Sequence, residues 1–180
     1  MNTKCCFLSS RWLSLGSGLQ NLGFAIMAGG MLALGAFTAP VVFGQFSRIE
    51  AGPVMAIIFR RFDMVLQVAL LLALLGESLR IGTRQLKHHG LLPALRWILL
   101  GALTLSLLYA TQFLNADIER LNRAGTHRDL TTVAGRQFEQ KHKLSEGIYK
   151  ANLWIVILLI LLTPFMDHPL ANPKENRPKV

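Results

Sequence analysis

Ionisable side chains interrupt one of the long apolar runs of this chain. The segment FRRFD at 59–63 places two arginines and an aspartate among apolar residues. Charged groups within a membrane are costly, so they usually face other helices or a water-filled cavity. At about 100° per residue, Arg60, Asp63 and Gln67 share one helix face, and Arg60 can pair with Asp63 at i, i+3. Arg61 points away, where its long side chain can reach lipid headgroups.

Two interpretations of this cluster remain open. In the first, the arginines anchor the helix at the membrane interface, and an internal ion pair satisfies Asp63. In the second, the cluster is a buried polar site in which Arg60 receives an anionic ligand or a lipid headgroup and Asp63 holds Arg60 in place. Both interpretations predict a helix at this position.

A second polar face leads into the last apolar run. Its residues are spaced three or four apart, as on one helix face: Phe138, His142, Ser145, Tyr149 and Asn152. Asn115 and Asp117 follow the preceding apolar run at a similar depth on the same predicted side. We hypothesise that these groups converge in one polar site, which comprises Arg60, Asp63, Gln67, Asn115, Asp117, His142, Ser145 and Tyr149. The alternative is hydrogen bonding between helices that only fixes the bundle.

Recognisable catalytic or metal-binding motifs do not accompany these residues. The sequence has no nucleophile elbow, Walker loop, HExxH or GxGxxG. All five histidines fall outside the apolar runs, which argues against a haem held by two intramembrane histidines. Cys5 and Cys6 are the only cysteines, too few for a metal site or a disulfide framework, and either a structural role or lipid attachment fits them. We expect no enzymatic activity, cofactor or metal.

Four apolar runs must position the polar residues. Of 180 residues, 52% are hydrophobic and only 16% are charged, whereas soluble domains average roughly 25% charged. Because a helix needs about 20 apolar residues to cross a bilayer, we predict an all-α integral membrane four-helix bundle over residues 21–166. The predicted spans cover residues 21–44, 54–79, 93–116 and 148–166. Helix-forming residues at 115–123, and a further helix from Thr131 or Thr132, predict a helical extramembrane extension between the third and fourth spans.

The flanks of the bundle carry much of the charge. Residues 1–20 are typical of an interfacial segment, and residues 167–180, with three prolines, should be disordered. The net charge of +9 comes from short basic clusters between the apolar runs, so it does not indicate nucleic acid binding. One predicted side holds three acids and nine basic residues: Lys4, Arg11, Arg80, Arg84, Lys87, Arg96, Lys174, Arg177 and Lys179. The positive-inside rule therefore predicts that both termini are cytoplasmic.

Small residues mark a packing face in the first apolar run. Ala25, Gly29 and Ala33 recur every four residues, and small side chains let helices approach closely in lipid. This spacing predicts a packing seam within the bundle. Pro40 lacks a backbone N–H and clashes with the preceding turn, so it predicts a kink.

Three segments carry a resemblance to a known family. They are GGMLALGAFTAPVVFG at 29–44, AGPVMAIIFRRFD at 51–63 and FEQKHKLS at 138–145. In order and spacing they resemble the four-helix membrane proteins of the domain-of-unknown-function 4149 group, to which the transmembrane protein 205-like proteins are similar. Two features depart from the family pattern, because Lys141 stands where an apolar residue is commoner and charged residues flank His142. The resemblance implies a multi-pass membrane protein without an established activity.

These observations favour a non-enzymatic structural or accessory module embedded in the lipid bilayer. Its expected partner is a further copy of the chain or a larger membrane complex. The alternatives are a small transporter or export factor, whose polar site the FRRFD and His142 regions would form, and a membrane enzyme acting on a lipid or porphyrin.

Overall fold

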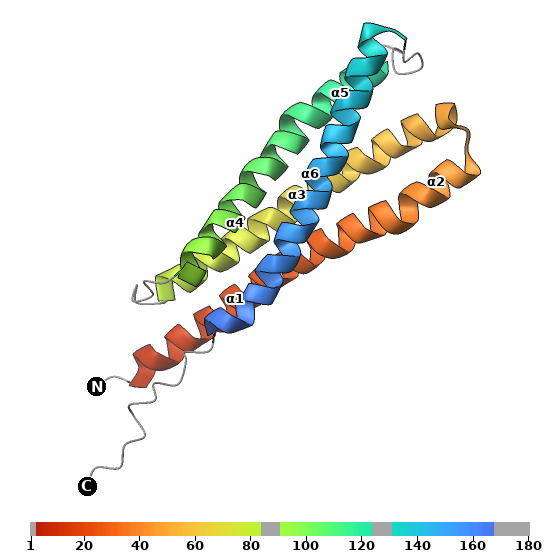
Figure 1. The fold of residues 1–180 in the computed structure, drawn as a ribbon. Helices are drawn as coiled ribbons and strands as arrows, with labels where there is room; N and C mark the ends of the chain where they lie inside the picture. The colour runs from red at the N-terminus through yellow and green to blue at the C-terminus, as the bar shows by residue number, and fades with distance from the viewer. Residues whose placement is uncertain (1–2, 84–90, 124–130, 168–180) are drawn as a thin grey trace.

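Long helices make up nearly all of the described chain. The computed structural model describes residues 3–83, 91–123 and 131–167, and contains no strand in these ranges (Figure 1). In chain order the elements are α1 (Thr3–Leu32), η1 (Ala33–Thr38), α2 (Ala39–Gln45), α3 (Arg48–Thr83), α4 (Leu91–Tyr109), η2 (Ala110–Leu114), α5 (Asn115–Arg123) and α6 (Val133–Asp167). The tail predicted to be disordered lies outside the described residues, apart from Asp167 at the end of α6.

Four helical segments among the described residues are long and apolar enough to cross a membrane. They cover Trp12–Gln45, Glu50–Ile81, Leu91–Asn122 and Val133–Pro164. At 1.5 Å per residue, a helix of 32 residues is about 48 Å long, which exceeds the roughly 30 Å of a hydrocarbon core. The structure therefore confirms the all-α membrane bundle. Each helix extends beyond its predicted span, and α1 continues without a break through the segment expected to be interfacial.

The elements form two antiparallel pairs. The first pair consists of α1 to α2 packed on α3, and the second of α4 to α5 packed on α6 (Figure 1). The last turns of α6 also lie beside α1 at Asn21 and Ala25, which joins the pairs at one end. At the other end the pairs diverge, and η1 and α2 contain no buried residue.

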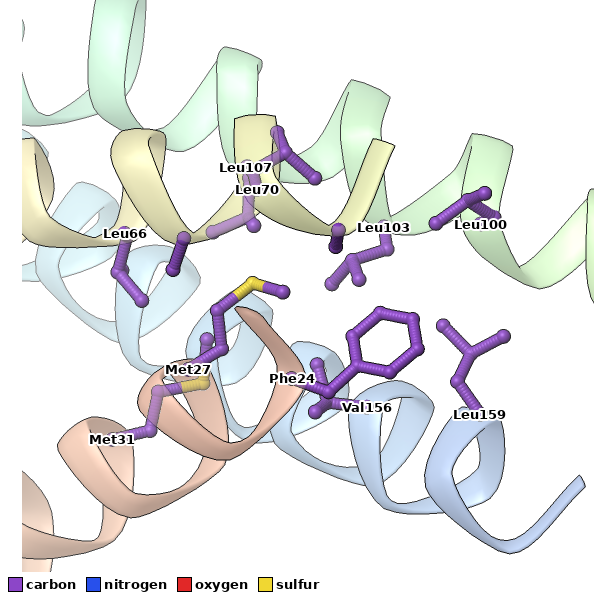
Figure 2. Packing of buried hydrophobic residues seen from close by; sticks show 12 residues of the cluster. Phe24, Met27, Met31, Leu66, Leu70, Leu100, Leu103, Leu107, Val156 and Leu159 are labelled. Atoms are coloured by element: carbon purple, nitrogen blue, oxygen red, sulfur yellow. The ribbon is translucent and has the colours of Figure 1, made fainter. Parts of the chain in front are cut away.

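Apolar side chains from both pairs meet in the middle of the bundle (Figure 2). One stripe from each long helix contributes: Phe24, Met27 and Met31 from α1; Leu66, Ala69, Leu70 and Ala73 from α3; Leu100, Leu103 and Leu107 from α4; Val156 and Leu159 from α6. The spacing of three or four residues keeps each set on one helix face. In lipid this close packing, and not the exclusion of water, holds the helices together.

Close approach of α1 and α3 depends on glycines. A Cβ added to Gly23 would lie 2.5 Å from the backbone oxygen of Ala69, and one added to Gly76 would lie 2.5 Å from the backbone oxygen of Gly16. No side chain fits at such distances. The packing seam within the bundle therefore runs along Gly16, Gly23 and Gly76.

The small residues singled out from the sequence do not form this seam. Ala25, Gly29 and Ala33 are exposed, and a Cβ added to Gly29 would meet no atom of a neighbouring helix within 4 Å. The physical reason is that α1 carries small residues on two faces, and α3 packs against the face where Gly23 meets Ala69.

A π-helical turn precedes Pro40. In η1 the Ala39 N–H bonds to the carbonyl oxygen of Leu34, five residues back, and Pro40 then lies in the first turn of α2. Because proline has no N–H and its ring crowds the preceding turn, the helix widens there. The π turn is what the structure shows at this point, and the kink predicted at Pro40 stays a prediction.

Candidate functional site

Four of the eight predicted site residues form one hydrogen-bonded group, called here the Asp63 network. The Asn115 amide donates to one carboxylate oxygen of Asp63 at 2.8 Å, and the Tyr149 hydroxyl donates to the other at 2.6 Å. Ser145 donates to the side-chain oxygen of Asn115 at 3.1 Å. The structure thus brings α3, α5 and α6 together around a buried carboxylate.

A second π turn places Asn115 in this group. Within η2 the Asn115 N–H bonds to the carbonyl oxygen of Ala110, five residues back. A π turn holds one extra residue, which rotates the following helix by about 100° relative to a regular helix. The turn therefore sets which side chain of α5 faces Asp63.

Arg60 and Asp117 of the predicted site form ion pairs outside the Asp63 network. Arg60 forms an ion pair with Glu119 on α5, and Asp117 pairs with Lys141 on α6. The expected pairing of Arg60 with Asp63 is wrong, because Asp63 faces the bundle interior whereas the Arg60 side chain is 55% exposed. The first ion pair links α3 to α5 and the second links α5 to α6, and both lie at the surface outside the Asp63 network.

Gln67 and His142 also lie outside the network. His142 is exposed and stacks on Phe138, with ring centroids 6.0 Å apart and planes 4° from parallel. Gln67 is half-buried on α3. Among the described residues, neither side chain makes a hydrogen bond to the Asp63 network.

A second polar group, which sequence reasoning missed, lies at the other end of the core. Called here the Arg96 network, it draws on all four long helices and consists of Gln20, Glu77, Arg80, Arg96 and Thr163. One oxygen of the Glu77 carboxylate accepts from Gln20 at 2.5 Å and from Arg96 at 3.2 Å, and lies 3.6 Å from Arg80 Nη1. Arg80 also donates to Gln20, and Arg96 Nη1 donates to Thr163 at 3.2 Å.

The two arginines of this network were assigned to the membrane surface from sequence. Arg80 is 2% exposed and Arg96 is 1% exposed, so both lie inside the bundle. Two of the nine basic residues counted for the orientation are thus internal. The signal that could have found them is the i, i+3 pair of Glu77 and Arg80 at the end of an apolar run, the same spacing as in FRRFD.

The two networks flank the apolar core. Asp63 and Glu77 both lie on α3, ~21 Å apart at about 1.5 Å per residue. Between them, Ser106 of α4 donates to Asn152 of α6 at 2.5 Å. In the part of the chain that the structure describes, no group of three metal-binding side chains gathers at either network.

Comparison with known families identifies the chain. A family model for a domain of unknown function, DUF4149, matches residues 22–127, more than half of the sequence. The chain belongs to this family. The DUF4149 match includes Asp63, Arg96 and Asn115, whereas the motif at 138–145 lies outside it. The likeness to the transmembrane protein 205-like proteins stays a prediction.

No curated protein and no solved structure matches the chain. Membership of the DUF4149 family and the four apolar helices together make this a multi-pass membrane protein. The description of the DUF4149 family states no activity, so only the geometry of the chain bears on its function.

Proposed function

We propose that this DUF4149 protein is a non-enzymatic accessory module of a membrane complex, with both termini on the cytoplasmic side. The observation that carries the proposal is the exposed stripe of Ala25, Gly29 and Ala33 on α1. The seam within the chain uses Gly16 and Gly23 instead, so the stripe is available to another helix.

Physical chemistry favours association at this face. In lipid, helices associate by packing, and small residues spaced four apart allow close backbone contact. The neighbouring η1 and α2 bury no residue, and their Phe37 and Val41 side chains are 70% and 62% exposed. A partner helix, from a further copy or from another membrane protein, would cover Gly29, Ala33 and these larger side chains.

Substitution of Gly29 tests this proposal. Gly29→Leu places a large side chain on the stripe without any clash inside the chain, and Gly101→Leu on α4 is the matched control, since a Cβ at either glycine meets no atom within 4 Å. Overpacking costs about 1–3 kcal/mol, which corresponds to roughly 5- to 150-fold in affinity. After purification in mild detergent, we expect the wild type and Gly101→Leu to retain a stoichiometric partner and Gly29→Leu to lose it.

Two results would contradict the proposal. One is a wild-type protein that stays monomeric and without a partner in both mild detergent and lipid nanodiscs. The other is equal retention of the partner by the Gly29→Leu and Gly101→Leu variants.

A transport function is the second candidate, favoured by the buried carboxylate of Asp63. Within the described residues its hydrogen-bond partners are the neutral side chains of Asn115 and Tyr149. Ionisable groups inside a membrane commonly serve proton or ion pathways. In proteoliposomes with a pH-sensitive dye, transport predicts proton flux that Asp63→Asn abolishes and that Asp117→Asn at the surface preserves. The absence of flux in the wild type would reject proton-coupled transport.

A further inference from the structure

A pocket lies beside the Arg96 network, between α1 and α6. Its volume is about 410 Å³, and its lining residues are Asn21, Ala25, Ile160, Thr163 and Pro164. Thr163 belongs both to the pocket wall and to the network, because its hydroxyl accepts the hydrogen bond from Arg96 Nη1. A single side chain thus connects the pocket with a buried guanidinium group.

Arg96 has donor capacity that the network does not use. Its Nη2 atom bonds to Glu77 and its Nη1 atom to Thr163, whereas its Nε atom is buried without a hydrogen-bond acceptor among the described residues. The Glu77 oxygen that it contacts is shared with Gln20. A buried donor without an acceptor costs about 1–3 kcal/mol. The network also holds two arginines against one glutamate, so a negative charge in the neighbouring pocket would stabilise this end of the bundle.

Apart from Pro164, the lining of the pocket changes from polar to apolar along the helices. Because α1 and α6 are antiparallel (Figure 1), Asn21 and Thr163 lie about one turn farther from the core than Ala25 and Ile160. Except for Thr163, these residues are exposed on the outside of the bundle. A lipid in a bilayer has the same order, since its headgroup lies at the membrane boundary and its acyl chains extend toward the centre.

We propose that this pocket binds the phosphate group of an anionic phospholipid. Arg96 supplies the positive charge behind Thr163, Asn21 donates to a phosphate oxygen, and an acyl chain lies along Ile160. Arg96 is 1% exposed and is not among the lining residues, so it attracts the phosphate as a positive charge behind the pocket wall. A headgroup that carries its own cation, such as choline, would place a second positive charge beside Arg96. The site should therefore prefer phosphatidylglycerol to phosphatidylcholine.

Lipid binding to the purified full chain tests the proposal. The probes are phosphatidylglycerol, phosphatidylcholine and inorganic phosphate, and retained lipid is measured by native mass spectrometry with titration in detergent. We expect phosphatidylglycerol to bind at least tenfold more tightly than phosphatidylcholine. Arg96→Gln and the pocket-filling Ile160→Trp should each weaken that binding at least tenfold, and Arg61→Gln, at an exposed arginine, should leave it unchanged.

The remaining outcomes each decide against the proposal. Equal affinity for the two lipids, or equal weakening by Arg61→Gln and Arg96→Gln, would reduce the effect to general surface attraction. Inorganic phosphate that binds as tightly as phosphatidylglycerol would identify a free anion as the ligand. If Arg96→Gln does not fold, the test depends on Ile160→Trp and Asn21→Ala, because both positions are exposed. Wild-type affinity for phosphatidylglycerol in both of these variants would overturn the proposal.

Discussion

The Asp63 and Arg96 networks both place charged side chains inside the bundle, but the first carries a net negative charge and the second a net positive charge. Each buries an ionisable group at one end of the core, ~21 Å apart along α3. Around Asp63, neutral donors occupy both carboxylate oxygens. Around Glu77, two arginines and Gln20 approach one carboxylate, and Arg96 keeps a donor without an acceptor. The first network is closed within the chain, whereas the second has capacity for a ligand.

This difference predicts how the two ends respond to substitution. A buried charged group that has lost its partner lowers the free energy of unfolding far more than a neutral group that has lost its partner. The Arg96 network should therefore dominate stability, the Asp63 network should contribute less, and the surface ion pairs should contribute least.

Removal of the central carboxylate from the Arg96 network should have the largest effect. Glu77→Ala leaves the buried guanidinium of Arg96 without its carboxylate, so we expect a loss of about 3–5 kcal/mol in the free energy of unfolding. Denaturation in mixed micelles, followed by circular dichroism, measures it. Glu146→Ala, which breaks the exposed pair with Lys150, is the control and should cost less than about 1 kcal/mol. Similar losses in both variants would refute the ranking.

An intermediate effect is expected at the Asp63 network. Tyr149→Phe removes one donor to Asp63 and leaves Asn115 in place, so the loss should be about 1–2 kcal/mol in the same assay. Tyr109→Phe on α4, at a half-exposed ring, is the control and should change little. A loss as large as that of Glu77→Ala would mean that the two ends are equivalent.

The smallest effect is expected at the surface. Arg60→Ala breaks the ion pair with Glu119, and because the arginine is 55% exposed we expect a loss of at most about 1 kcal/mol. The unfolding midpoint should rise or fall little with salt concentration for this variant. A loss of several kcal/mol would place Arg60 in a buried site, as the second interpretation of FRRFD holds.

Periodicity within continuous helices was the part of the molecule that sequence could predict. Ser145 and Tyr149 share a face of α6 by simple spacing, and both reach Asn115 or Asp63. The four apolar runs likewise follow from the length that a bilayer demands. Such features depend on one helix at a time, so they can be predicted from the sequence.

Apart from the shared depth of Asp63, Asn115 and Tyr149, features that depend on two helices at once were not predictable. Whether Gly23 or Gly29 packs inward depends on the surface that α3 presents, and the partner of Arg60 depends on where α5 lies. The π turn before Asn115 shifts the helix face by one residue, which a regular periodicity does not anticipate. Arg96 resembles a boundary charge in the sequence because it lies close to a helix end, whereas in the fold it meets Glu77 of α3 and Thr163 of α6 inside the bundle.

The contrast between the networks is that, among the described residues, Glu77 has a charged partner whereas Asp63 has only neutral ones. Its most direct test is a pair of double-mutant cycles, one on Glu77 with Arg96 and one on Asp63 with Arg60. The cycles measure the coupling free energy within each pair by unfolding in mixed micelles. The structure predicts a coupling of about 1.5–3 kcal/mol for Glu77 with Arg96, which bond at 3.2 Å, and close to zero for Asp63 with Arg60. Strong coupling between Asp63 and Arg60, or none between Glu77 and Arg96, would contradict the account.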